Sequence, residues 1–140
     1  MTEGNRRTNL ALEIEKGENA LRAAALCAEA GLWDDAVSRA YYAAFHHVQA
    51  LLLTQGQEAR SHAGTHHLFH LHFVRAGLVP SRIGKLLSGL QKYREQADYE
   101  RAVAFSEEGA REELAHAEEI CSFVRERLIA EGWIAAPAGA

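Results

Sequence analysis

Apolar residues at helical spacing, ended by single glycines, are the feature that most limits what this chain can fold into. The segment between Trp33 and Gly56 shows the pattern most clearly. Its apolar residues recur every three or four positions, at Val37, Ala40, Tyr41, Ala44, Val48 and Leu51. This period places them on one face of an amphipathic helix. No segment alternates at period two with β-branched residues, so we predict no sheet.

The same pattern predicts five helices in an all-α fold. They are expected from Asn9 to Ala30, from an Asp34 cap to Gly56, from Ser61 to Ala76, after Pro80, and from a Ser106 cap to Gly132. Short loops between long amphipathic helices favour an up-and-down antiparallel bundle. Residues 1–8 are polar, and residues 133–140 are small and weakly patterned. We therefore expect a disordered N-terminus, one helical domain over 9–132 and a flexible tail.

Length and charge limit the classes of function. The 140 residues are enough for one domain with a substantial core. The formal net charge is −4, so nucleic acid would have to bind a local basic patch. The sequence has no secretion signal and no apolar run that approaches about 18 residues, so we expect a cytoplasmic protein without membrane contact. No phosphate-loop, dinucleotide or serine-hydrolase motif occurs, and we predict no cofactor.

A second, polar stripe runs along the helix that follows Trp33. Arg39 and His46 lie almost directly above each other on a helix, with Tyr42 to one side. An unpaired guanidinium cannot face the centre of the core, because its burial would cost several kcal/mol. The stripe is therefore either a solvated face or the wall of an interface or pocket.

Charged and aromatic residues also gather in KYREQADYE, residues 92–100. Arg94 and Asp98 are four positions apart and would be neighbours on a helix, and Tyr99 follows directly. One interpretation is an ordinary surface ion pair. The other is that Asp98 holds the guanidinium of Arg94 in one pose for phosphate, which arginine binds through two parallel hydrogen bonds.

Three stretches in this order resemble the HEPN domain: GLWDDAVSRAYYAAFHH, SHAGTHHLFHLHFVRAGLVP and LLSGLQKYREQADYE. The resemblance covers roughly residues 10–130 and is greatest to the small stand-alone HEPN proteins of bacteria and archaea. It implies an up-and-down helical bundle and a homodimer. It also implies a partner, a minimal nucleotidyltransferase encoded by a neighbouring gene, often in a toxin–antitoxin couple.

The resemblance also bears on catalysis. HEPN ribonucleases carry the motif R-x4–6-H, in which arginine stabilises charge on an RNA phosphate and histidine moves a proton without a metal. Arg94 matches the arginine, but Tyr99 stands where the shortest form of the motif has histidine. A phenol with a pKa of about 10 is a poor base at neutral pH. His46 and His62 match other positions of the family pattern and are the candidate replacements.

Histidines concentrate in SHAGTHHLFHLH, residues 61–72. His62, His66 and His70 form a row at spacing i, i+4, i+8, a geometry that can bind metal. The row has no carboxylate or cysteine at a fitting position, and zinc sites generally need a third or fourth ligand. We therefore predict no metal site.

These observations leave three hypotheses about function. In the first, the protein is a dimeric partner of a minimal nucleotidyltransferase, and one polar site binds RNA, phosphate or nucleotide through Arg39, Tyr42, His46, Arg94, Asp98 and Tyr99. In the second, it is a ribonuclease toxin in which Arg94 acts with His46 or His62. In the third, it is a helical interaction scaffold. The first two require the polar stripe and the 94–99 segment to converge within hydrogen-bond reach.

Overall fold

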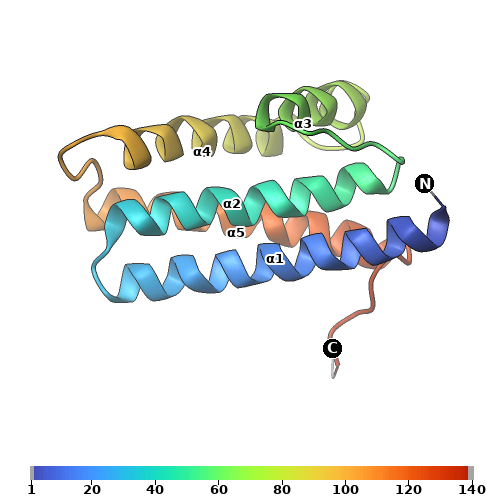
Figure 1. The fold of residues 1–140 in the computed structure, drawn as a ribbon, viewed down its shortest axis with the longest axis horizontal. Coiled ribbons are helices and arrows are strands. Elements are labelled where there is room, and N and C mark those ends of the chain that lie inside the picture. The colour runs from blue at the N-terminus through green and yellow to red at the C-terminus, as the bar shows by residue number, and fades with distance from the viewer. Residues whose placement is uncertain (1, 139–140) are drawn as a thin grey trace.

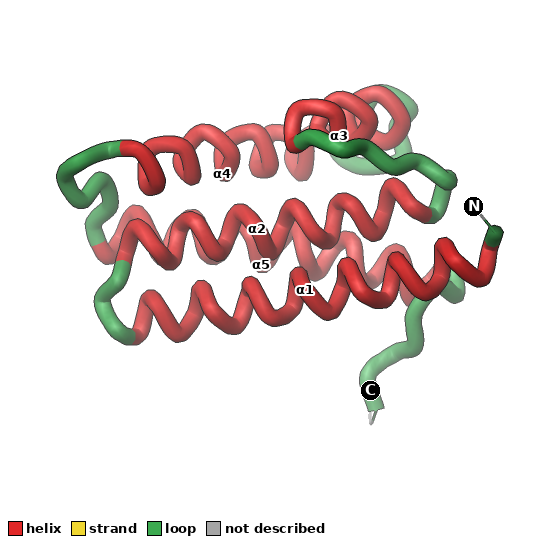
Figure 2. Tube along the Cα trace, viewed as in Figure 1, coloured by secondary structure: helices red, strands yellow, loops and turns green. Residues whose placement is uncertain are grey.

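A computed structural model describes residues 2–138, and every regular element in this range is helical (Figure 2). The elements are α1 (Glu3–Glu29), α2 (Trp33–Leu53), α3 (His62–Phe69), a π-helical turn η1 (His70–Val74), α4 (Ser81–Tyr99) and α5 (Glu107–Ala130). The predicted all-α fold of about five helices is confirmed. Among the described residues, no helix has the length and apolar composition needed to cross a membrane.

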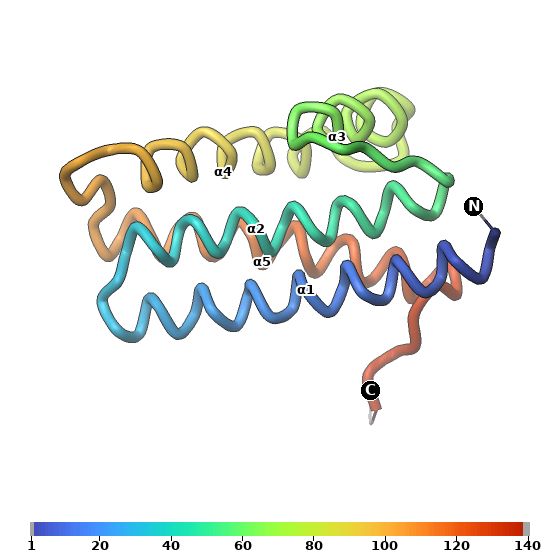
Figure 3. The backbone as a smooth tube through the Cα atoms, in the orientation of Figure 1, coloured from blue at the N-terminus to red at the C-terminus, as the bar shows by residue number. Residues whose placement is uncertain are grey.

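The four long helices run alternately in opposite directions (Figure 1). α3 and η1 form the connection between α2 and α4 at one end of this up-and-down bundle. The two ends of the described chain lie at that same end of the bundle, as the tube in Figure 3 shows. The helix predicted from Ser61 to Ala76 is shorter in the structure, because α3 ends at Phe69 and passes into the π-helical turn η1.

Helix α2 is the centre of the bundle. It packs against α1, α3, α4 and α5, and 14 of its 21 residues are buried. Alanines take up much of this surface, which lets the neighbouring helices approach closely. Because the buried face reaches nearly all round α2, its polar residues must find partners on the surrounding helices.

The helix stops are the part of the fold that the sequence predicts most directly. Gly31, Gly56, Gly77 and Gly132 have φ angles between +68° and +78°. This left-handed conformation is strained for residues with a Cβ atom. Each of these glycines follows one of the helical segments that the apolar pattern predicts.

The structure places part of α1 in the segment 1–8, for which we expected disorder. α1 begins at Glu3, where Oγ1 of Thr2 accepts a hydrogen bond from the backbone N–H of Asn5 at 3.1 Å. Arg7 lies over the ring of Trp133 at 4.5 Å, which ties the start of α1 to the segment after α5. The periodicity of apolar residues in the sequence does not predict either contact. Met1 lies outside the described residues.

Beyond residue 132, where we expected the domain to end, the chain still contacts the core. Trp133 and Ile134, the first two residues of the predicted flexible tail, are partly buried against the core. Residues 139 and 140 lie outside the described part of the chain. The packed unit therefore includes residues on both sides of the predicted 9–132 range.

The expected Asp34 cap is also wrong. The cap position is Leu32, two residues earlier, and α2 begins at Trp33. The Leu32 side chain is apolar and cannot cap a helix. The carboxylate of Asp34 instead accepts hydrogen bonds from the backbone N–H groups of Ala104 and Phe105, both at 3.0 Å. Asp34 thus joins the start of α2 to the loop between α4 and α5.

A methyl group at Gly17 would collide with His47. Gly17 is buried within α1, and an added Cβ atom would overlap the imidazole of His47 and lie 3.3 Å from the carbonyl oxygen of Ala43. The imidazole cannot move easily, because Nδ1 of His47 donates to that carbonyl at 2.7 Å. We expect Gly17→Ala to lower the free energy of unfolding by about 1–3 kcal/mol, the usual range for overpacking.

Gly89→Ala on α4 is the matched control. A Cβ atom at Gly89 would meet no described heavy atom within 4 Å, so only helix propensity changes. This substitution is expected to raise the free energy of unfolding by about 0.5–1 kcal/mol. Urea unfolding of both variants gives the comparison. Stabilisation by Gly17→Ala as well would contradict tight packing between α1 and His47.

Candidate functional site

The candidate site lies where α2, α3 and α4 meet, and Tyr41 is its inner wall. Tyr41 is fully buried on α2. Its hydroxyl lies 2.8 Å from Nδ1 of His62 and 3.0 Å from Nε2 of His66, both on α3. Phe45, one turn along α2, stacks on His62 with ring centroids 4.1 Å apart. The start of α3 is therefore fixed onto α2 by aromatic stacking and by one shared hydroxyl.

Arg94 approaches the same wall from α4. Its guanidinium carbon lies 5.1 Å from the ring centroid of Tyr41 and 5.8 Å from that of Tyr42. A cation is attracted to the electron-rich face of such rings. The Arg94 side chain is only 12% exposed, and its Nε is buried without a hydrogen-bond partner among the described residues. Tyrosine rings, rather than carboxylates, thus hold most of this guanidinium.

Asp98 pairs with Arg94 weakly. Nη1 of Arg94 lies 3.4 Å from Oδ2 of Asp98, one helical turn further along α4. This distance is at the long end for a charge-assisted hydrogen bond. The Nη N–H groups that Asp98 does not engage can therefore serve an anionic ligand, whereas the Nε–H is buried.

The polar stripe of α2 meets Arg94 through Tyr42. The half-buried ring of Tyr42 lies under Arg94 and also 5.0 Å from the guanidinium carbon of Arg39. The stripe and the 94–99 segment thus meet on one surface through ring faces. The described residues show no hydrogen bond between them, although the first two hypotheses required convergence within hydrogen-bond reach. Tyr42 is shared between two arginines from two helices.

Neither His46 nor Tyr99 has a described contact with the guanidinium of Arg94. Nδ1 of His46 lies 2.7 Å from Oε2 of Glu13, so a carboxylate of α1 engages this imidazole. Tyr99 is 76% exposed at the end of α4. Of the two candidate replacements for the motif histidine, only His62 bonds to the residue on which Arg94 lies.

Electrostatics fix the charge state of the inner groups. Burial raises the pKa of the Tyr41 hydroxyl far above its usual value, so this group stays protonated. Burial, the charge of Arg94 and the nearby His46 lower the pKa of His62. Burial lowers the pKa of His66 to about 4, with smaller contributions from His70, His62 and Arg94. At neutral pH the site therefore contains two neutral imidazoles beside one cationic guanidinium.

A groove continues the site on the far side of Tyr42. It has a volume of about 350 Å³ between α1 and α2, and Arg39, Tyr42 and His46 line it together with Lys16 and Asn19. Sequence reasoning missed Lys16 and Asn19, because nothing in the periodicity of α1 marks them. It also placed Tyr41 in the apolar stripe and His66 in a metal-like row. The adjacent tyrosines and the i, i+4 histidine pair were the available signals.

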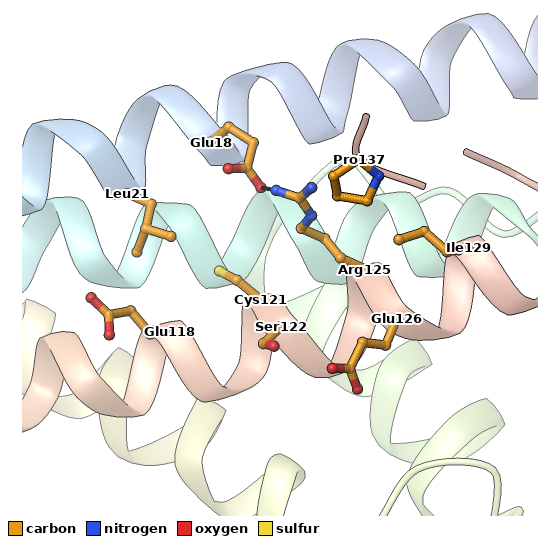
Figure 4. A pocket seen from close by; sticks show the side chains of 9 residues that line it. All are labelled: Glu18, Leu21, Glu118, Cys121, Ser122, Arg125, Glu126, Ile129 and Pro137. Carbon is orange, nitrogen blue, oxygen red and sulfur yellow. Dashed lines mark hydrogen bonds and ion pairs between the residues drawn. The ribbon is translucent and has the colours of Figure 1, made fainter. Parts of the chain in front are cut away.

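A second hollow of about 390 Å³ lies between α1, α5 and the C-terminal segment (Figure 4). Figure 4 shows the carboxylate of Glu18 paired with the guanidinium of Arg125. The distance from Oε1 of Glu18 to Nη1 of Arg125 is 2.6 Å. Burial raises the pKa of the Cys121 thiol on its wall, so the reactive thiolate is disfavoured. None of the residues predicted for a site lines this hollow.

The histidine row does not converge on one point. His62 and His66 both face the Tyr41 hydroxyl, whereas His70 lies beside Gly84 with Nε2 3.4 Å from the hydroxyl of Ser88. In the described part of the chain, no group of three or more histidine, cysteine, aspartate or glutamate side chains is arranged to hold a metal ion.

Comparison with known proteins identifies the family. The HEPN domain model matches residues 11–127, which is most of the chain. The chain belongs to the HEPN domain family. A HEPN homologue of known structure, archaeal ST0689, superposes with a TM-score of 0.69 over 85% of this chain and 97% of that protein, at 23% identity. This likeness establishes the shared fold.

Two similar proteins come from Methanocaldococcus jannaschii. The one named "Putative toxin MJ0605" is 42% identical over 86 residues, 61% of this chain and 64% of the relative. The one named "Putative toxin MJ0142" is 33% identical over 103 residues, 74% of this chain and 69% of the relative. The match thus spans slightly less than two thirds of the length of the first relative.

Proposed function

We propose that this HEPN protein binds the phosphate group of RNA or of a nucleotide at the Arg94 site. The observation that carries the proposal is the guanidinium of Arg94, held over the rings of Tyr41 and Tyr42 with its side chain 12% exposed. Among the described residues, Asp98 is the one carboxylate that pairs with it, and that contact is long at 3.4 Å. A guanidinium held in one pose loses little freedom on binding phosphate, and it offers two parallel donors.

The groove beside Tyr42 supports a ligand larger than phosphate alone. Its volume of about 350 Å³ is within the range of small-molecule sites, and Lys16 and Arg39 supply positive charge. Arg39 and Arg94 share the ring of Tyr42, so the groove and the Arg94 site form one surface. A nucleotide or a short RNA segment has the phosphates and the polar sugar that such a surface accepts.

We also propose that the protein acts as a homodimer in a toxin–antitoxin-like pair with a minimal nucleotidyltransferase. Two relatives carry the name of toxins. The partner and the dimer are what the resemblance to stand-alone HEPN proteins implies. Co-expression with the product of the neighbouring nucleotidyltransferase gene is expected to yield a complex that survives size-exclusion chromatography. Elution of the two proteins apart would refute the partnership without bearing on the Arg94 site.

A second candidate function is metal-independent cleavage of RNA. The observation that favours it is His62, whose lowered pKa leaves a neutral imidazole beside Arg94. Its hydrogen bond to Tyr41 uses Nδ1, so Nε2 is the nitrogen available to a 2′-hydroxyl. In this function His62 takes the place of the missing motif histidine, and Arg94 stabilises charge on the phosphate. His46 is less suited, because Glu13 engages it.

One assay separates these functions. The protein is incubated with 5′-labelled single-stranded RNA in EDTA, and binding and cleavage are followed together. Binding without cleavage supports the phosphate-binding module. Cleavage that His62→Ala abolishes and His46→Ala preserves supports the ribonuclease. If the wild-type protein neither binds nor cleaves RNA and does not bind ATP, both functions fail and the interaction scaffold remains.

A further inference from the structure

One hydroxyl lies between two imidazoles inside the bundle. The Tyr41 hydroxyl is 2.8 Å from Nδ1 of His62 and 3.0 Å from Nε2 of His66. Tyr41 is fully buried and His66 is 7% exposed, so water has little access to these contacts. A phenol hydroxyl has one proton to donate and lone pairs with which to accept.

The single proton of the Tyr41 hydroxyl restricts which nitrogen of each imidazole can carry a proton. A neutral imidazole has one N–H donor and one acceptor nitrogen. If Tyr41 donates to His66, then His62 must donate from Nδ1, and the proton of His66 is on Nδ1. If Tyr41 donates to His62, then His66 must donate from Nε2, and the proton of His62 is on Nε2. Any other combination leaves a buried donor without an acceptor or two acceptors facing one proton, which is unfavourable.

We propose that Tyr41 is a positioning residue that forces His62 and His66 into the same tautomer, both Nδ1–H or both Nε2–H. The outward nitrogen of His62, Nε2, is then an acceptor in the first state and a donor in the second. Tyr41 thereby determines whether His62 presents a lone pair or a proton to a ligand at Arg94. Tyr41 does not touch the ligand itself.

Exchange between the two states moves one proton along the row. A proton arrives at Nε2 of His62, the Nδ1 proton of His62 passes to the oxygen of Tyr41, and the hydroxyl proton of Tyr41 passes to Nε2 of His66. The proton on Nδ1 of His66 then leaves, so each group keeps its original charge. No oxidant or other reactant is required.

Other charged and titratable groups surround this chain of hydrogen bonds. The pKa of Tyr41 is affected by Arg94 and Glu95 of α4 and by Tyr42 of α2. The pKa of His62 is affected by Arg94 and His46. His70 of η1 acts on His66 together with Arg94. Burial, together with the smaller effect of the positive charge of Arg94, opposes a further proton on either ring. Both imidazoles therefore stay neutral, as the proton count requires.

The coupling has a consequence that rests on the proposed function. A phosphate oxygen beside Nε2 of His62 accepts hydrogen bonds and so favours the state with Nε2–H on both rings. Ligand binding at Arg94 would then change the tautomer of the buried His66. The coupling of tautomers in the free protein needs no ligand.

Side-chain ¹H–¹⁵N correlation spectra of uniformly ¹⁵N-labelled protein at pH 7.5 test the proposal, because they distinguish Nδ1–H from Nε2–H. In the free wild type, His62 and His66 are expected to have the same tautomer, or to exchange between the two together. Opposite tautomers would overturn the proposal. Addition of inorganic phosphate is expected to shift both rings toward Nε2–H. If phosphate shifts neither ring while the tautomers still match, the proposed ligand fails and the coupling stands.

Tyr41→Phe removes only the hydroxyl and is expected to let the two rings adopt tautomers independently. Tyr42→Phe, on the adjacent position of α2, keeps the hydroxyl between the histidines and should preserve their coupling. Loss of coupling in both variants would mean that packing rather than the Tyr41 hydroxyl sets the tautomers. If Tyr41→Phe does not fold, the wild-type spectra alone decide the question.

Discussion

Replacing Arg94 with alanine is expected to weaken binding of single-stranded RNA or ATP by about 10- to 100-fold. A hydrogen bond to a charged group contributes roughly 1.5–3 kcal/mol, and each 1.4 kcal/mol is a factor of ten in affinity. The loss should be near the upper end, because the rings of Tyr41 and Tyr42 hold this guanidinium in place before the ligand binds. Fluorescence anisotropy with a labelled oligonucleotide measures the change.

Lys92→Ala is the matched control for charge. Lys92 is exposed on the same helix, so this variant also loses one positive charge but keeps the Arg94 site. Its affinity is expected to change by less than about threefold, since an exposed charge is screened by salt. Equal losses in the two variants would indicate general electrostatic attraction instead of a phosphate site.

Arg94→Lys distinguishes charge from geometry. Lysine keeps the positive charge but lacks the planar fork that donates two parallel hydrogen bonds and stacks on tyrosine. We expect this variant to recover only part of the lost affinity. Full recovery would show that the site needs a cation of no particular shape, contrary to the role that we give the rings of Tyr41 and Tyr42.

Most of the fold is predictable because it depends on local pattern. The apolar period of α2 marks the helix that lies at the centre of the bundle, and the four glycines with positive φ mark where helical segments end. The errors lie where distant segments meet. Trp133 contacts Arg7, and the carboxylate of Asp34 accepts hydrogen bonds from the backbone of Ala104 and Phe105. The periodicity of apolar residues does not predict contacts between such distant positions.

The candidate site likewise has residues that the sequence indicates and a contact that only the structure shows. Arg94 and His62 are visible in the sequence as parts of a family pattern, and the structure places both against Tyr41. Tyr41 itself has the position of a core residue in the apolar stripe, and its phenol ring is in the core. Only its hydroxyl has a polar role, which depends on where α3 crosses α2. The periodicity of apolar residues can mark Tyr41 as a core residue, but it cannot show that the hydroxyl at the end of the ring has polar partners.

Acidification is expected to destabilise the protein through His66. The pKa of this imidazole falls from 6.5 to about 4 in the folded state, chiefly because burial disfavours the charged form. Between these values the unfolded chain binds a proton that the folded protein excludes. The contribution of His66 to stability is therefore complete above about pH 6.5, declines as the pH falls toward 4 and changes no further below that. The loss is about 3 kcal/mol.

Urea unfolding of the wild type and His66→Gln, at intervals from pH 7.5 to pH 4, isolates this contribution. The difference in unfolding free energy between the two proteins should shrink as the pH falls, because glutamine does not titrate. Some pH dependence should persist in the variant, since burial also lowers the pKa of His47 and His62. His67→Gln, at an exposed position on the same helix, is expected to follow the wild-type curve. A constant difference between wild type and His66→Gln would mean that His66 binds protons equally well in the folded and unfolded states, contrary to the effect of burial that we assign to it.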